Sequence, residues 1–530
     1  MAGFHPTVGS EDYLSPYSTS RMERNWPESA LDLPELSPLP KVGLLTMIRL
    51  GLFQMGLGMM SVLLFGLLNR ILIKELGIPG TIASLVLAVT LFVAPARIWF
   101  GQWSDTKPLF GLYRTGYVRI GSICFATIAF LAVQPIWKMG LFIKAGNWVQ
   151  ATEWIVLCMV LFGLYGVAIS ASSTPFATLL VDITDEDERS KIVAVDWSML
   201  LVGTIAGAIT IGVLLKKLGT CPSPELLQSS VNQLFLVVPW LVVAFAFIST
   251  WGVEKKYSRF LQNKNQERAA IVSQNLSQPS QLVGHKPKEV VGLNRAWTLL
   301  NASQQTRFFF TFLIAMTLGL FLQDTILEPF GGDVFNLPAG ETALLNVPYG
   351  VGTVIGILIS GFFIAPRIGK KKTTQLGCQG VVLALGAIVC SGFTANAAVL
   401  KLCLLLFGLA SGITTTGAIT LMLDLTAAES AGTFIGAWGL AQALSRGMAA
   451  VLGGGLLDTG SSVFRSAPAA LAAVSCATSR ETHPPIAYGL VLGVQAMIML
   501  GAIALLNRVS VQEFKSDAKE TIKAVIANDN

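Results

Sequence analysis

The chain has 530 residues, of which 53% are hydrophobic and only 13% are charged, and its mean hydropathy is +0.63. A soluble domain cannot hide so much apolar surface from water, so the composition excludes a soluble protein and indicates a membrane protein with many spans. The formal net charge of +6 is modest for this length, and no nucleic-acid partner is expected.

The N-terminal segment, residues 1–42, is polar and rich in Ser, Pro, Glu and Asp. It lacks the basic and apolar regions of a cleavable signal, so we expect a cytoplasmic N-tail whose following membrane helix acts as the targeting element.

Twelve apolar runs follow, each near the roughly 20 residues that a helix needs to cross the hydrocarbon. They predict an N-terminal six-helix bundle at 43–253, a cytoplasmic linker at 254–306, a C-terminal six-helix bundle at 307–507 and a cytoplasmic C-tail at 508–530. The predicted spans are 43–69, 79–100, 117–137, 153–178, 192–214, 232–253, 307–330, 342–366, 374–393, 397–423, 432–456 and 486–507.

The basic residues predict the orientation. The N-tail, the C-tail and the even-numbered loops contain 25 Lys and Arg residues, against 9 in the odd-numbered loops and 3 inside helices. Because basic residues near helix ends resist translocation, both termini are expected on the cytoplasmic side.

The first predicted span contains Arg49, roughly 10 Å into the helix at about 1.5 Å per residue. A charge inside the membrane marks a functional candidate, but a long side chain also reaches the surface by snorkelling. A cavity role and snorkelling therefore both remain open for Arg49.

The loop after the second span combines five spaced residues: Gly101, Asp105, Lys107, Gly111 and Arg114. It resembles the signature gating loop of the major facilitator superfamily, although residues 108–110 look like an insertion. In that loop a glycine lets helices approach closely, and a carboxylate at a helix end holds basic groups or helix N-termini until the conformation changes.

An internal repeat supports two related halves. Residues 180–184 (Leu-Val-Asp-Ile-Thr) return as residues 422–426 (Met-Leu-Asp-Leu-Thr), and Trp197 returns as Trp438, at spacings of 242 and 241. Such half-length symmetry is typical of secondary transporters. We therefore predict an all-α protein with twelve transmembrane helices in two pseudo-symmetric six-helix halves, the major facilitator superfamily fold.

The end of the seventh predicted span contains Asp324 and Glu328, which lie on one face of a continuous helix. They come 17 and 21 residues after Arg307, which places them close to the external surface. This position favours an external gate or docking feature over a proton relay, with solvated helix-end charges as the alternative. Pro329 and the glycines after it are expected to end the helix.

The eleventh predicted span contains Arg446, about 20 Å from the start of its helix, where snorkelling is difficult. We expect it to have a partner inside the bundle, and Asp196 of the fifth span is one candidate.

Two longer strings narrow the resemblance. Residues 49–58 with 68–70 in the first span, and residues 323–332 at the end of the seventh, resemble the PucC or bacteriochlorophyll-delivery family. The strings 92–101, 107–111 and 114–118 resemble its cyanobacterial members. The resemblance implies delivery of (bacterio)chlorophyll, as transient cargo with no permanently bound cofactor, to light-harvesting or photosystem apoproteins. It also implies a thylakoid or bacterial inner membrane, and pigment-synthesis enzymes as further partners beside the lipid bilayer.

A pigment carrier needs ligands for magnesium, and the three histidines all lie outside the predicted spans: His5, His285 and His483. Amide oxygens are acceptable ligands for a hard cation, so Gln54, Asn69 and Gln323 are candidates. Each also suits an ordinary interhelical hydrogen bond.

Cys221 and Cys476 fall in predicted external loops, where a disulfide or two free thiols are possible. No nucleotide-binding, metalloprotease or nucleophile motif occurs in a plausible context, so enzymatic activity is not expected. Two alternatives to pigment delivery stay open: a secondary transporter of an unidentified small solute, and a non-transporting assembly scaffold.

Overall fold

The computed structural model describes residues 41–184, 186–216, 223–264, 304–394, 396–425, 431–464 and 483–510. The chain divides into two units, Met1–Pro40 and Lys41–Asn530, and every described residue belongs to the second. Several predictions concern residues outside this part: the N-tail to residue 40, most of the 254–306 linker, the C-tail beyond residue 510, His5, His285, Cys221 and Cys476.

Helices make up nearly all of the described residues, and twelve of them are long and apolar enough to cross a membrane, which confirms the predicted number. The first half contains α1 Leu44–Ser61 with η2 Val62–Leu68 and η3 Ile71–Glu75, α2 Gly80–Phe92, α3 Ala96–Thr106, α4 Thr115–Lys144, α5 Trp148–Asp182, α6 Glu186–Leu214, α7 Pro224–Thr250 and α8 Val253–Tyr257. The second contains α11 Gln304–Phe321 with η4 Leu322–Thr325, α12 Leu327–Phe335, α13 Ala339–Ala343, α14 Asn346–Ile359, η5 Ser360–Ile364, α15 Ala365–Ile368, α16 Lys370–Ser391, α17 Ala397–Leu425, α18 Ala431–Phe464 and α19 Pro485–Arg508.

Several helices extend past the predicted apolar runs. Helix α4 has 30 residues, about 45 Å at about 1.5 Å per residue, although the apolar run ends near residue 137. The apolar residues resume after Lys138, at 139–143, and Lys144 ends the helix, where its Nζ donates to the carbonyl of Glu75 at 3.0 Å. A single lysine inside the helix thus ended the predicted run too early.

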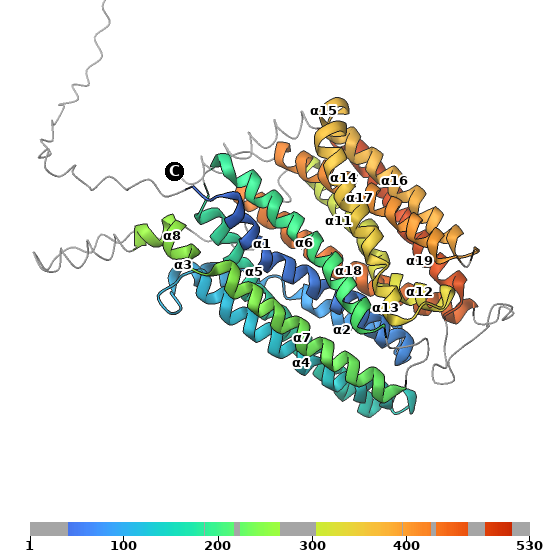
Figure 1. The fold of residues 1–530 in the computed structure, drawn as a ribbon. Coiled ribbons are helices and arrows are strands. Elements are labelled where there is room, and N and C mark those ends of the chain that lie inside the picture. Colours follow the sequence, from blue (N-terminus) through green and yellow to red (C-terminus); the bar gives the residue numbers. More distant parts are fainter. Residues whose placement is uncertain are drawn as a thin grey trace, which may run out of the picture. The chain divides into compact units, whose positions relative to one another are not determined.

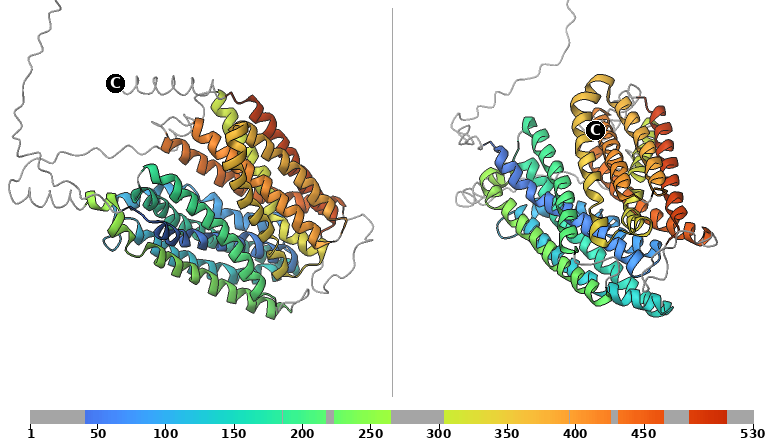
Figure 2. Two further views of the ribbon diagram at one scale, coloured as in Figure 1. Left: turned by 45° about the horizontal axis from the view of Figure 1, so that its top comes forward. Right: turned by 45° about the vertical axis from the view of Figure 1, so that its right-hand side comes forward.

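The two halves form two groups of helices, blue to green and yellow to red in Figures 1 and 2. Because the chain crosses the bundle repeatedly, its loops gather at two ends. One includes Asp105, at the end of α3, and is called here the Asp105 end. The other includes Asp333, in α12, and is called the Asp333 end.

Close backbone packing fixes α6 against α1. A Cβ added to Gly203 would lie 1.9 Å from the carbonyl oxygen of Met55, and one added to Gly207 would lie 2.8 Å from the Cα of Met59. Only glycine fits at such distances, as in the small-residue interfaces of membrane helices.

The seventh span is not the single helix that the sequence predicts. The α-helix α11 stops at Phe321, the 3₁₀ turn η4 follows at Leu322–Thr325, and α12 continues through Pro329 to Phe335. Pro329 therefore does not end the helix, because it stands in the first turn of α12, where its missing N–H has no helical partner to lose. The prediction that Asp324 and Glu328 share one face of a continuous helix is wrong, since η4 separates their environments.

Candidate functional site

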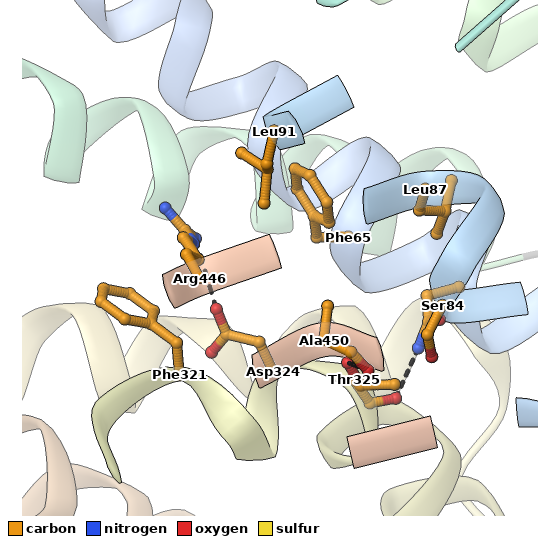
Figure 3. Close-up of a pocket in the computed structure, with 10 residues that line it drawn as sticks. Phe65, Ser84, Leu87, Leu91, Phe321, Asp324, Thr325, Arg446 and Ala450 are labelled. Carbon is orange, nitrogen blue, oxygen red and sulfur yellow. Dashed lines mark hydrogen bonds and ion pairs between the residues drawn. The ribbon is translucent and has the colours of Figure 1, made fainter. Parts of the chain in front are cut away.

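The candidate site is a pocket between the two halves (Figure 3). Five of its lining residues come from the first half and five from the second. They are Phe65, Asn69, Ser84, Leu87 and Leu91, and Phe321, Asp324, Thr325, Arg446 and Ala450. The pocket therefore lies where any relative movement of the halves must change its shape.

An ion pair stands in this pocket. Nη2 of Arg446 lies 3.3 Å from Oδ2 of Asp324, and the guanidinium stacks over the ring of Phe321 at 4.4 Å. The second aromatic neighbour, Phe65 from the first half, lies 5.8 Å from the guanidinium. The side chain of Arg446 remains 34% exposed, so the pair stays accessible to a ligand or water.

The ion pair corrects two predictions. The partner of Arg446 is Asp324 and not Asp196, because the η4 turn directs the carboxylate toward α18. Arg446 is near the middle of α18, Ala431–Phe464, so Asp324 lies deep in the bundle and not near its surface.

A hydrogen bond between the halves lies beside the pair. The buried side chain of Asn69 donates through Nδ2 to the carbonyl oxygen of Thr325. In a regular α-helix that carbonyl would accept from residue 329, but Pro329 has no N–H. The proline thus frees a backbone acceptor in the second half, and an amide of the first half satisfies it.

The other amides give no vacant magnesium ligand here. Gln323 is buried, accepts a hydrogen bond from Nε2 of Gln495 and donates to Oδ1 of Asp324 at 3.0 Å. Gln54 is half-buried on α1 and does not line this pocket. The cavity volume is about 10 Å³, room for about one water molecule. A pigment ring does not fit in this pocket in the present conformation.

The Asp333 end joins the halves through a carboxylate at a helix N-terminus. Oδ1 of Asp458 accepts from the backbone N–H of Gly80 at 2.7 Å, and its Oδ2 accepts from the N–H and hydroxyl of Thr81 at 2.7 and 2.6 Å. The helices touch beside this cap: a Cβ added to Gly454 would lie 2.2 Å from the carbonyl oxygen of Gly80. The cap thus binds α18 of one half to α2 of the other.

Two cations of the first span, Arg70 and Lys74, make a second connection between the halves at this end. Arg70, 1% exposed, donates to the hydroxyl of Thr342 and to the carbonyl of Leu337 at 3.0 Å. Nζ of Lys74 lies 3.1 Å from Oδ1 of Asp333, whose Oδ2 accepts from the hydroxyl of Tyr488 at 2.6 Å. Together with the Asp458 cap, these bonds hold the Asp333 end closed.

Glu328 lies in the first turn of α12. Its Oε1 accepts from Nδ2 of Asn346 at 3.0 Å, while its Oε2 is buried without a hydrogen bond.

The predicted gating loop is held within the first half. Arg114, 2% exposed, forms ion pairs with Asp105 and, at 2.9 Å, with Asp182. The buried carboxylate of Glu254 accepts backbone hydrogen bonds at 2.6, 3.0 and 2.7 Å from Tyr113, Arg114 and Thr115, at the start of α4. Asp105 thus has a partner in its own half in this conformation.

The remaining loop residues have simpler surroundings. Gly111 has a φ of +74°, a backbone conformation that favours glycine. A Cβ at Gly101 would meet Thr174 at an ordinary 3.7 Å, so close helix approach does not require a glycine there. Lys107 lies 5.8 Å from the ring of Trp103.

Arg49 lies in α1 and donates to the carbonyl of Trp251 at 3.2 Å. Its side chain extends toward the Asp105 end, as expected for snorkelling.

Sequence reasoning missed the residues that join the halves at the Asp333 end. Asp458 lies two residues beyond the predicted eleventh span, and Arg70 appeared only as part of a family string. Asp182 was visible as the acid of the internal repeat, although its partner Arg114 was not. A rule that carboxylates just past a span cap helices of the other half would have found Asp458.

The architecture matches that of known transporters. The chain is similar to the structure of the nucleoside transporter NupG, with a TM-score of 0.58, 13% identity and coverage of 87% of this chain and 98% of that one. It is also similar to a bacterial homologue of the iron transporter ferroportin in an inward-facing state, with a TM-score of 0.58, 14% identity and coverage of 88% and 97%. This is the major facilitator superfamily fold of an integral membrane protein.

The relatives found by sequence identify the family within this fold. The chain is 30% identical over 422 residues to the bacteriochlorophyll synthase 44.5 kDa chain of Rhodobacter capsulatus, covering 79% of this chain and 88% of that protein. It is 27% identical over 428 residues to Protein PucC of Rhodobacter capsulatus, covering 79% and 85%. A family profile described as PUCC protein matches residues 67–514. The chain therefore belongs to the PUCC protein family.

Proposed function

We propose that this protein delivers (bacterio)chlorophyll to newly made apoproteins of light-harvesting or photosystem complexes, or assists their assembly. The observation that supports this best is membership of the PUCC family together with a relative named for bacteriochlorophyll synthase. The proposed partners are chlorophyll-binding apoproteins and pigment-synthesis enzymes, and no enzymatic activity of the chain itself is proposed.

The proposed cycle uses the contacts between the halves. In the present state, the Asp458 cap and the Lys74–Asp333 pair hold one end closed. Breaking both would let α2 and α18 separate and widen the pocket around Arg446 and Asp324. Cargo too large for the present cavity would then gain access, so the pigment would be held transiently.

The membrane and its orientation are part of the proposal. The distribution of Lys and Arg supports a cytoplasmic Asp105 end, with both termini on that side. A photosynthetic membrane, either a thylakoid or a bacterial inner membrane, suits the proposed cargo.

A solute transporter is the second candidate, and one observation favours it. The pocket offers a guanidinium, a carboxylate and two aromatic rings, groups that suit a small polar solute better than a pigment. Such a protein would show saturable uptake in proteoliposomes. An assembly scaffold is the third candidate, and it would not need the halves to move.

The test is purification in mild detergent from a chlorophyll-making host, followed by an absorption spectrum across the visible and near-infrared and identification of the polypeptides that co-purify. We expect chlorophyll, or light-harvesting polypeptides, with the wild type and less of either with Arg446→Gln. The matched control is Arg367→Gln, an exposed arginine of α15. A colourless protein without such partners would contradict the proposal.

A disulfide lock separates the cycle from the scaffold. Thr81 and Asp458 touch through their side chains across the halves, so Thr81→Cys with Asp458→Cys places two thiols in reach. Oxidation should stop pigment delivery and reduction should restore it. Assembly that continues in the oxidised protein would support a scaffold instead.

A further inference from the structure

A two-residue β-turn follows α3 at the Asp105 end. Leu109 and Leu112 exchange backbone hydrogen bonds of 2.8 and 3.0 Å, and the two residues between them, Phe110 and Gly111, have φ angles of +54° and +74°. Positive φ at both central positions defines a type I′ turn, which Asn-Gly and Gly-Gly favour.

Phe110 is unusual in this conformation. A bulky residue with positive φ is disfavoured by contact between its Cβ and the backbone, and Asn336 is the only other non-glycine residue with positive φ in the described chain. The side chain of Phe110 is also 87% exposed. It therefore buries little apolar surface within the protein that would offset its backbone strain.

The base of the turn packs against α4, whereas Phe110 at its tip is exposed. A Cβ added to Gly116 would lie 2.6 Å from the carbonyl oxygen of Leu109, which shows how closely the turn packs on the start of α4. The hydroxyl of Tyr117 donates to the carbonyl of Lys107 at 3.0 Å. The protein thus presents Phe110 outward from a rigid support.

Two exposed tryptophans precede Phe110 in the chain. Trp99 and Trp103, 65% and 48% exposed, lie on α3 within the last two turns of the second span, which ends at Thr106. Exposed tryptophans at the end of a span are typical of the layer where lipid headgroups meet the hydrocarbon. Phe110 follows that span by four residues, so it lies near the same layer.

Three described lysines at this end are exposed: Lys107, Lys255 and Lys256. Two described acids beside them are engaged within the protein, because the buried Glu254 caps α4 and Asp105 is paired with Arg114. Exposed lysines beside a membrane attract anionic headgroups.

We propose that Phe110 inserts into the headgroup layer of a bilayer that contains anionic lipid, with Lys107, Lys255 and Lys256 beside the lipid phosphates. The contact anchors the loop between the second and third spans to the membrane surface. It does not depend on the cargo, so it stands whether or not the protein delivers pigment.

The first test places an environment-sensitive fluorophore at Phe110→Cys, in a chain whose Cys124, Cys221, Cys390 and Cys476 are serine. The protein is reconstituted in nanodiscs of phosphatidylcholine, alone or mixed with phosphatidylglycerol. We expect blue-shifted emission and quenching by lipids spin-labelled near the headgroup, both stronger with phosphatidylglycerol. The same label at Phe393, which is 88% exposed two residues past its span at the Asp333 end, should give emission that does not change with phosphatidylglycerol. Water-like emission at position 110 that responds to iodide but not to spin-labelled lipid would overturn the proposal.

The second test measures thermal stability. Phe110→Gly relieves the backbone strain, so its Tm in detergent should equal or exceed that of the wild type. The rise in Tm on adding phosphatidylglycerol should fall several-fold in this variant and persist in Phe110→Trp. An unchanged lipid-dependent rise in Phe110→Gly would overturn the proposal. So would cross-linking between two copies through position 110 in lipid-free detergent, which would indicate a protein partner.

Discussion

Substitution of Asp458 should open the Asp333 end. Its carboxylate accepts three hydrogen bonds of 2.6–2.7 Å from Gly80 and Thr81 at the start of α2. A hydrogen bond to a charged group contributes about 1.5–3 kcal/mol, but bonds that share one carboxylate are not additive. We therefore expect Asp458→Ala to cost the closed state about 2–4 kcal/mol, a change of roughly 30- to 700-fold in the ratio of closed to open molecules. Asp458→Asn keeps an acceptor and should have a smaller effect.

The assay is cysteine accessibility. Ser84 lines the pocket one turn after Gly80 and is 1% exposed, so Ser84→Cys should react slowly with a membrane-impermeant maleimide while the end is closed. In the Asp458→Ala background its labelling rate should rise by more than tenfold. The matched control is Ser249→Cys, equally buried on α7, whose rate should not change. Equal Ser84→Cys rates in both backgrounds would refute the assignment of Asp458 as a closing contact.

Two further predictions concern buried groups. Gly203→Ala should lower the free energy of unfolding by about 1–3 kcal/mol, because its Cβ would lie 1.9 Å from the backbone carbonyl oxygen of Met55, whereas Gly489→Ala, where the added Cβ meets nothing within 4 Å, should leave the Tm nearly unchanged. Glu254→Gln should lower the Tm, because a neutral amide oxygen replaces the charged acceptor of three N–H groups at the start of α4; a Tm equal to the wild type would argue that this cap is dispensable.

The sequence was sufficient for the architecture because membrane spans follow from composition. Apolar runs of the right length located all twelve helices, and the half-length repeat indicated two related bundles. Errors occurred where a charged residue interrupts an apolar run, as at Lys138 of α4, since a hydropathy window stops at charge even when a long side chain escapes the apolar layer.

The site was predicted only in part because its geometry depends on departures from regular helix. Arg446 and Asp324 were both recognised as intramembrane or near-membrane charges, but their pairing requires the 3₁₀ turn at Leu322–Thr325. No local pattern signalled that turn: Pro329 pointed to a helix end, and its actual effect was to free the carbonyl four residues earlier. Contacts between halves, such as that of Asp458 with Thr81, join residues 377 apart and have no signature in spacing.

The bond between Asn69 and Thr325 also affects how the protein is made. The two residues are 256 positions apart, so Asn69 enters the membrane long before the seventh span has been synthesised. Until then its buried amide lacks the partner it has in the finished protein, and an unpaired amide in hydrocarbon is costly. When the seventh span inserts, the carbonyl of Thr325 has no donor in its own helix, because Pro329 lacks an N–H. The first half thus supplies the donor and the second half the acceptor, and the amide of Asn69 is satisfied only after the second half has inserted beside the first.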